Sequence, residues 1–170
     1  PCADLYLDFP HSTETEKYRR ELDLNTGLSK VSYDFEGTRF TRESFASYPD
    51  KSIVSRISAN KKGAVSFSLS LKSPHENTVK YSISNNEVVL KGHVKDGAIK
   101  FEVHLLVSTK GGEIIKGSEG LEVVGADAAT IKIVAATNFT NYKNLDANPN
   151  ERCVEMLHQI AEKSYDDIYS

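Results

Sequence analysis

The sequence predicts a mainly β protein in which two antiparallel sheets pack face to face as a sandwich, followed by a C-terminal helix. Three observations predict this fold. Apolar and polar residues alternate in short runs from about residue 4 to about residue 137, turn-forming residues separate the runs, and the periodicity becomes helical only after residue 148. The runs number roughly ten to twelve, which is more strands than one open twisted sheet usually holds.

Five runs show the alternation clearly, and each marks the core-facing side of a half-buried strand. In the clearest run, Val65, Phe67, Leu69 and Leu71 alternate with serine or lysine. The apolar positions of the other runs are Leu5, Leu7 and Phe9; Val79, Tyr81 and Ile83; Phe101, Val103, Leu105 and Val107; and Ala129, Ile131, Ile133 and Ala135.

Residues that tolerate a positive φ lie between the runs and predict hairpin turns. They are Asn25-Thr26-Gly27, Glu36-Gly37, Gly63, Asn85-Asn86, Asp96-Gly97 and Gly111-Gly112.

A helix is predicted to begin at Asn148. Asparagine is a good N-cap, Pro149 suits the first helical position, and Glu151 stands three residues after the cap. Val154, Leu157, Ala161 and Ile168 then fall on one apolar stripe. We therefore divide the chain into a β-sandwich domain over 1–147 and the start of a linker helix over 148–170, and we expect it to be a piece trimmed at both ends.

Charge and hydropathy exclude two classes of partner. The 21 basic and 24 acidic residues are spread along the chain and give a formal charge of -3, so no basic patch for nucleic acid is expected. No apolar run approaches the roughly 18 to 20 residues that cross a bilayer, so no membrane partner is expected.

Cysteine and histidine patterns predict neither a metal site nor a cofactor. Cys2 and Cys153 lie near opposite ends without metal-ligand spacing, and whether they form a disulfide stays open. The histidines occur without an H-E-x-x-H, H-x-H or G-x-S-x-G pattern; they are His11, His75, His93, His104 and His158. His104 has the parity opposite to the apolar residues of its run, so it is expected to face solvent or the less apolar side.

Two further kinds of site find little support in the sequence. The stretch Gly117-Ser118-Glu119-Gly120 opens no helix, so it predicts a turn rather than a phosphate loop. Glycoside hydrolysis uses two carboxylates at a defined separation, and no pair among the acidic residues can be nominated from sequence alone. We therefore assign no catalytic residue to this chain.

Aromatic platforms that bind sugars are the remaining possibility. The chain has no Trp, and the tyrosines outside the alternating runs are Tyr48, Tyr142, Tyr165 and Tyr169. Tyr142 is the best candidate for a sugar contact, although tyrosines at strand ends more often cap a core.

Four stretches, taken together and in order, resemble the N-terminal β-sandwich domain of glycoside hydrolase family 95, which is α-L-fucosidase-like. They are DLYLDF at 4–9, YRRELDLNTGLSKVSY at 18–33, FTRESFASYPDKSIVSRISANKKGAVSFSLSLKSPH at 40–75 and GADAATIKIVAATNFTNYK at 125–143. Ala3 stands where the family usually has glycine.

The resemblance implies a super-sandwich joined by a helical linker to a catalytic (α/α)6 barrel that hydrolyses terminal α-L-fucosyl or α-L-galactosyl linkages with inversion. The family's catalytic carboxylates belong to that barrel, so none carries over to this chain. It also implies opening strands before Pro1, whose absence would leave a sheet edge open to another copy. The implied location is secreted or periplasmic, and the implied partners are the barrel and fucosylated or galactosylated oligosaccharide.

Two polar segments that follow strands are candidates for the rim of the barrel's pocket, namely Ser73-Pro74-His75 and Thr137 to Tyr142. The candidate residues are His75, Asn138, Asn141 and Tyr142. Alternatively, Asn138 and Asn141 satisfy turn backbone and Phe139 closes the sandwich end. Asn138-Phe139-Thr140 is also a glycosylation sequon in a secretory host.

The leading functional hypothesis is therefore a non-catalytic domain that supports the barrel and shapes its entrance. The alternatives are a free-standing carbohydrate-binding module and a small enzyme in its own right.

Overall fold

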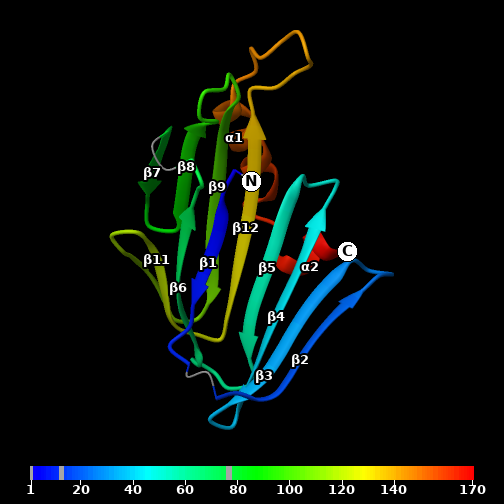
Figure 1. Cartoon of the computed structure of the whole chain (residues 1–170). Helices are drawn as coiled ribbons and strands as arrows, with labels where there is room; N and C mark the ends of the chain where they lie inside the picture. The colour runs from blue at the N-terminus through cyan, green and yellow to red at the C-terminus, as the bar shows by residue number, and fades with distance from the viewer. Residues whose placement is uncertain (1, 12–13, 76–77) are drawn as a thin grey trace.

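The computed structural model describes residues 2–11, 14–75 and 78–170. Over these residues the chain forms twelve strands and two short helices, arranged in three layers (Figure 1). A small sheet packs on one face of a large sheet, and both helices pack on the other face. The mainly β, antiparallel two-sheet fold that the sequence predicts is confirmed.

The small sheet has four antiparallel strands in the order β1-β6-β11-β10. They are β1 (Asp4–Asp8), β6 (Val65–Lys72), β11 (Gly120–Ala126) and β10 (Glu113–Lys116). The large sheet has eight antiparallel strands in the order β2-β3-β4-β5-β12-β9-β8-β7. They are β2 (Glu16–Asp23), β3 (Leu28–Phe35), β4 (Thr38–Ser47), β5 (Ser52–Ala59), β12 (Ala128–Thr137), β9 (Lys100–Lys110), β8 (Glu87–His93) and β7 (Val79–Ile83).

The inner core lies between the two sheets and is built from the alternating residues that the sequence predicts. Along β6 the apolar positions are buried, whereas the intervening serines and Lys72 are half-buried or exposed. Leu105 and Val107 of β9 meet this core from the large sheet. Two predicted core positions are wrong: Tyr81 lies on edge strand β7 and is 47% exposed, and Ala135 of β12 is exposed.

The turns predicted as hairpins are hairpins only in the cases in which the two strands that they join belong to the same sheet. Glu36 and Gly37 have φ values of 48° and 68° and join β3 to β4. The predicted hairpins at Gly63 and at Gly111-Gly112 are wrong, because these residues join β5 to β6 and β9 to β10, which lie in different sheets. A positive φ allows a tight reversal but does not decide which sheet the chain enters next.

Two helices, α1 (Pro149–Ile160) and α2 (Tyr165–Tyr169), cover the outer face of the large sheet. Asn148 caps α1 as predicted, its side chain accepting from the Asn150 backbone nitrogen at 3.0 Å. The single helix over 148–170 is interrupted after Ile160, because Ser164 starts α2 with its own capping box. Neither helix is long and apolar enough to cross a membrane, within the part of the chain that the structure describes.

The buried stripe of α1 differs from the predicted one. Cys153 and Ile160 are buried, with Met156 and Leu157 packed beside them, whereas Val154 is 51% exposed. Ala161 is also exposed, although Ile168 of α2 is buried as predicted. The spacing Cys153, Met156, Leu157, Ile160 is the better amphipathic pattern, since it follows one helix face through two turns.

A buried lysine fastens the turn between the helices to the sheet. Lys132 on β12 is 3% exposed. Its Nζ donates to the carbonyl oxygens of Ile160, Ala161 and Lys163 at 2.7, 2.8 and 2.6 Å. An ammonium group has three donors, and the last carbonyls of a helix have no partner within the helix. Burial lowers the pKa of Lys132, and the carboxylates of Glu162 and Asp167 oppose this shift.

Both cysteines are free thiols and lie on opposite faces of the large sheet. Cys2 packs against the inner core, and Cys153 belongs to the outer core beneath α1. Burial raises the pKa of the Cys153 thiol to about 12. The open question of a disulfide between them is thus answered by the sheet that separates them.

Replacing Lys132 by methionine tests the attachment of the helices. Lys132→Met removes the side-chain donor from three carbonyl oxygens, of which Ile160 keeps only the Lys163 backbone nitrogen at 3.2 Å, so we expect the free energy of unfolding to fall by about 2 to 4 kcal/mol. Urea unfolding measures this, with the exposed Lys95→Met as the matched control, which should change stability by less than about 0.5 kcal/mol. Equal effects of the two substitutions would contradict the assigned role of Lys132.

Candidate functional site

Connecting segments gather at one end of the sandwich, at the top of Figure 1. They are residues 73–75 after β6, the turn 94–99 between β8 and β9, and the loop 138–148 between β12 and α1. The Asn138 backbone nitrogen donates to the Lys100 carbonyl oxygen at 3.1 Å, and the His75 ring centroid lies 5.6 Å from that of Phe101. The structure therefore brings the predicted residues His75 and Asn138 to the same end, on either side of the start of β9.

Asn138 holds this end together. It is 5% exposed. Its Oδ1 accepts from the Lys100 backbone nitrogen at 2.8 Å, and its Nδ2 donates to the carbonyl oxygens of Ala98 and Leu145 at 3.1 and 2.9 Å. The amide therefore satisfies the backbone of three segments, which is the structural alternative that the sequence left open for this residue.

The tip of loop 138–148 is exposed, whereas its base is fixed. Arg152 of α1 donates to the carbonyl oxygens of Thr137 and Phe139 at 2.9 and 2.8 Å. At the tip, the Asn141 side chain accepts from the Lys143 backbone nitrogen at 2.9 Å, and Tyr142 is 85% exposed. Phe139 is 47% exposed, so the prediction that it closes the sandwich end is wrong. The loop presents an aromatic ring and an amide to solvent from a rigid base.

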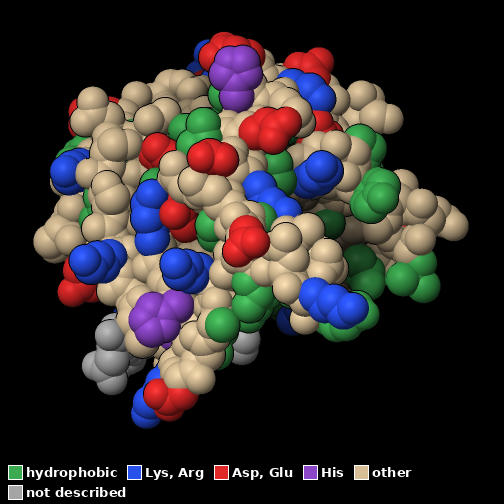
Figure 2. All heavy atoms as spheres, turned by 90° about the horizontal axis from the view of Figure 1, so that it is seen from above, with side chains coloured by type: hydrophobic (Ala, Val, Ile, Leu, Met, Phe, Trp, Pro, Cys, Tyr) green, Lys and Arg blue, Asp and Glu red, His purple; other side chains and the backbone are tan. Residues whose placement is uncertain are grey.

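An open hollow of about 550 Å³ lies beside the loop, between it and the β8–β9 hairpin. Its polar walls include Lys91, His93, Lys100, Glu102 and Asp146, and Leu145 and Pro149 add apolar surface. Figure 2 looks onto this end and shows lysine, arginine, acidic and histidine side chains intermingled over it. The hollow therefore combines polar groups of both signs with apolar surface.

A buried polar cluster lies under α1, next to the hollow. The His104 ring places Nδ1 at 2.9 Å from Glu87 Oε1 and Nε2 at 3.1 Å from Glu102 Oε2. Glu102 also accepts from Lys91 Nζ at 3.1 Å and from Asn150 Nδ2 at 3.0 Å. Both nitrogens of the ring are engaged, the residue is 4% exposed, and Asn150 ties α1 to Glu102, so the cluster holds α1 on the sheet.

The cluster decides between the two alternatives predicted for His104 and adds residues that the sequence did not suggest. His104 lies on the outer, less apolar face as predicted, but it does not face solvent, because α1 covers that face. Glu102 and Lys91 were not singled out. The available signal was the amphipathic helix after Asn148, which must bury its apolar side against one face of a sheet.

Electrostatics favour the ionised form of Glu102. Burial alone would raise the pKa of Glu102, but the hydrogen bonds from Asn150, His104 and Lys91 outweigh it, and the pKa is lowered. Among residues 2–11, 14–75 and 78–170, no group of three or more histidine, cysteine, aspartate or glutamate side chains is placed to hold a metal ion.

Comparison with known proteins assigns this architecture to a family. The model of the family described as "Glycosyl hydrolase family 65, N-terminal domain" matches residues 1–142. The chain belongs to this family. The N-terminal domain of a glycoside hydrolase that the sequence predicts is therefore confirmed, whereas its narrower placement in family 95 stays a prediction.

Relatives of this glycosyl hydrolase N-terminal domain include one plant protein and one fungal protein. "Alpha-L-fucosidase 2" of Arabidopsis thaliana is 30% identical over 198 residues, covering 99% of this chain and 24% of that protein. "Probable alpha-fucosidase A" of Aspergillus niger is 36% identical over 58 residues, covering 34% of this chain and 7% of that protein. The chain thus spans about a quarter or less of the length of these relatives.

A solved structure shares the fold of the family 65-type domain. "Putative kojibiose phosphorylase from human microbiome" superposes with a TM-score of 0.60 at 12% sequence identity, covering 92% of this chain and 24% of that chain. At this identity the likeness concerns the fold alone.

Replacing Glu102 by glutamine tests the cluster through pH. The pKa of Glu102 is lowered in the folded state, so its stabilisation is fully present above its ordinary value of 4.5 and is lost as pH falls through the lower folded value. We expect Glu102→Gln to reduce the free energy of unfolding by about 1 to 3 kcal/mol at about pH 7, and by less at about pH 3. Urea unfolding at both pH values measures this. The exposed Glu155→Gln is the control, and a Glu102→Gln effect that does not depend on pH would contradict the assignment.

Proposed function

We propose that this chain is the non-catalytic N-terminal domain of an α-L-fucosidase-like glycoside hydrolase resembling family 95. One observation carries the proposal: the similarity to "Alpha-L-fucosidase 2" runs along 99% of this chain but covers only 24% of that protein. A domain that matches so small a share of the relative leaves ample length for a separate catalytic part. The proposed parent hydrolyses terminal α-L-fucosyl or α-L-galactosyl linkages by inversion and is secreted or periplasmic.

Catalysis is proposed to reside in an (α/α)6 barrel elsewhere in the parent polypeptide. A buried cluster of titratable groups near the candidate end, around His104, has its ring nitrogens bonded to carboxylates and lies beneath α1. Such an arrangement supports the fold and leaves proton transfer to other residues. The sandwich would therefore act by supporting the barrel.

The exposed loop 138–148 is proposed to shape the entrance of the barrel's pocket. Tyr142 offers an aromatic face that can cover the C–H groups of a sugar ring, and the Asn141 amide suits hydroxyl groups. The base of the loop is fixed by Arg152 and Asn138, so these side chains are presented at low cost in conformational entropy.

A free-standing carbohydrate-binding module is the second candidate. The observation that favours it is the hollow of about 550 Å³ beside the same loop, which could hold a sugar without a barrel. The two candidates differ in one measurable property, because only a module should bind fucosylated oligosaccharide as an isolated chain.

Hydrolysis assays on the chain and on the parent test the location of catalysis. We expect the full-length polypeptide to hydrolyse an aryl α-L-fucoside and the 170-residue chain to give no hydrolysis above buffer. Calorimetric titration of the chain with fucosylated oligosaccharide is run in parallel. Hydrolysis by the chain would overturn the non-catalytic assignment, and oligosaccharide binding by the chain would favour the module.

Substitution of Tyr142 tests the proposed entrance. In the full-length enzyme we expect Tyr142→Ala to raise KM for a fucosylated oligosaccharide about fivefold with kcat unchanged, since loss of one stacking contact costs about 1 kcal/mol of binding. Tyr48→Ala is the matched control, because Tyr48 is 93% exposed but lies in the turn between β4 and β5. An unchanged KM for Tyr142→Ala, or an equal rise for Tyr48→Ala, would remove Tyr142 from the entrance.

A further inference from the structure

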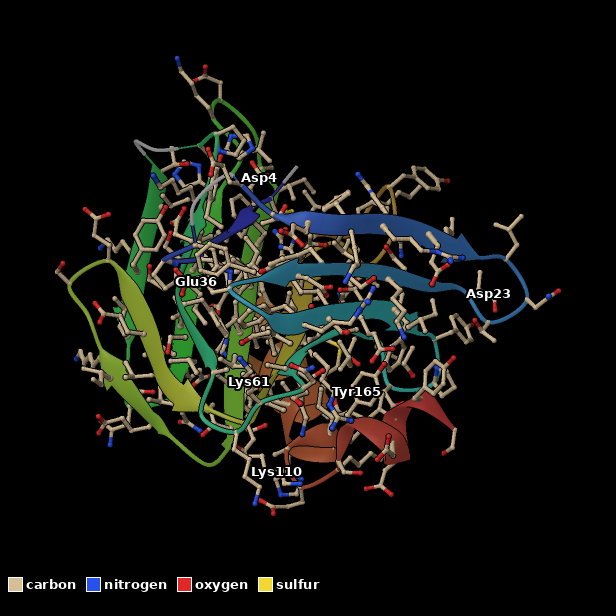
Figure 3. The ribbon with its side chains drawn as sticks, turned by 90° about the horizontal axis from the view of Figure 1, so that it is seen from below. Asp4, Asp23, Glu36, Lys61, Lys110 and Tyr165 are labelled. Carbon is tan, nitrogen blue, oxygen red and sulfur yellow. The ribbon has the colours of Figure 1, made fainter. Side chains whose placement is uncertain are left out.

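The outer face of the small sheet carries a groove that follows β6. Figure 3 shows this sheet on the side of the large sheet away from the helix that carries Tyr165. Three hollows of about 400, 200 and 290 Å³ lie in that order along β6. The first borders Ser66 and Ser68, the second borders Ser68 and Ser70, and the third borders Ser70 and Lys72. We call the three hollows together the β6 groove.

Short side chains on β6 form the floor of the groove. The first three outward residues of this strand are serines, whereas its inward residues are buried in the inner core. The neighbouring strands supply longer side chains as walls, because Asp8 of β1 and Glu122 of β11 pair with Ser68 from its two sides. At roughly 3.3 Å per residue, the groove from Ser66 to Lys72 is about 20 Å long. Its shape therefore suits a linear chain better than a compact molecule.

The polar groups of the groove are free to bind a ligand. Within the described part of the chain, the Ser68 and Ser70 hydroxyl groups make no hydrogen bond, and Asp8 and Glu122 make no ion pair. Asn138 at the candidate end differs, because backbone groups occupy its amide. A hydroxyl group both donates and accepts, and a carboxylate accepts, so this set of side chains matches a ligand rich in hydroxyl groups.

Apolar surface lies at both ends of the groove. Phe9, Pro10 and Val124 line the hollow at the start of β6. Tyr81 and Ile83, from edge strand β7 of the large sheet, line the hollow at the end of β6. The Tyr81 side chain is exposed, so one ring face can cover the C–H groups of a sugar. The groove thus combines polar contacts along its floor with apolar contacts at its ends.

Charge and strand pairing disfavour other classes of ligand. Among the described residues, three carboxylates and one lysine line the groove, namely Asp8, Glu119, Glu122 and Lys72. An anionic chain is therefore repelled. Strand β6 pairs with β1 along one edge and with β11 along the other, so it has no free backbone edge to which a peptide strand could add. Binding along the groove depends on side chains, which favours an oligosaccharide over a peptide.

We propose that the β6 groove binds a straight, neutral oligosaccharide chain along β6. The serines of the floor and the carboxylates of the walls bond its hydroxyl groups, and the apolar ends cover its sugar rings. The groove and the hollow beside loop 138–148 have separate walls, so this is a second site. In the proposed parent enzyme it would hold the catalytic part near a polymer chain, but the binding itself does not depend on that function.

Calorimetric titration of the full-length polypeptide with cellohexaose tests the proposal. Cellohexaose is a straight, neutral chain without fucose, so its binding does not report recognition of a terminal fucosyl group. We expect cellohexaose to bind and hexagalacturonate, an anionic chain of equal length, not to bind. The strongly curved maltohexaose should bind more weakly than cellohexaose, because the groove follows a strand.

Three substitutions locate the site. Ser68→Gln fills the middle of the floor and should weaken cellohexaose binding about tenfold, because it displaces the chain from the neighbouring polar groups. Glu122→Gln keeps the shape of the wall and removes a charged acceptor, so it should weaken binding about threefold. Ser82→Gln is the matched control, since Ser82 is exposed on β7 outside the groove, and it should leave binding unchanged. Thermal unfolding of each variant shows whether it is folded, and Glu122→Gln decides the test if Ser68→Gln folds poorly.

The remaining outcomes contradict the proposal. Failure of the unaltered polypeptide to bind cellohexaose would remove the site, and binding that Ser68→Gln and Glu122→Gln both leave unchanged would place it elsewhere. Binding of hexalysine in place of cellohexaose would assign the groove to a basic segment. Hydrolysis of an aryl α-L-fucoside is measured on the same preparations, so failure of the proposed function is distinguishable from failure of this site.

Discussion

Burial of β12 on both faces is the constraint on which the rest of the structure depends. Its inner side chains Ala129 and Ile131 complete an apolar core between the sheets. Its outer face instead carries Lys132 and Val134, which are also buried. A buried ammonium group is tolerated only when its donors are satisfied, and here carbonyl oxygens at the end of α1 and in the turn after it satisfy them. The need of the Lys132 ammonium group for hydrogen-bond acceptors thus fixes where the helices lie on the sheet.

The position of α1 in turn fixes the end of the sandwich that carries the candidate site. Arg152 reaches from the helix to the base of loop 138–148, and Asn150 reaches to Glu102 in the buried cluster. The loop therefore has one anchor on the helix and another at Asn138, where three segments meet. Its tip at Tyr142 stays exposed because both anchors lie at its base. Displacement of α1 would move the loop, so helix packing and the geometry of the proposed entrance are coupled.

The sequence predicted burial correctly in strands where each side chain lies either in the core or in solvent. Phe67 and its neighbours on β6 alternate cleanly because only one face of the small sheet is covered. It left two environments open for His104, since a strand pattern does not reveal that a helix from much later in the chain covers the second face. Gly112 was assigned to a hairpin because a positive φ is local information, whereas the sheet that the next strand joins depends on distant pairing. Asn138 was recognised as a candidate but not as an anchor, because its partner Ala98 lies 40 residues away.

The loop at the candidate end and the inner face of the outlying strands of the large sheet differ in kind. The tip of loop 138–148 is exposed on a base held by several hydrogen bonds, which is how binding residues are usually carried on a rigid scaffold. The inner face of β2 to β5 differs from it, because exposed Ile53 and Leu22 share that face with Ser44 and Arg42, and burial there is confined to positions such as Ile57 next to the inner core. A fold shared at 12% identity persists although most side chains differ, so the layers rather than particular side chains set the shape. On this basis, sequence changes between relatives should concentrate at the exposed tip of loop 138–148 and spare the residues at its base, such as Asn138 and Arg152.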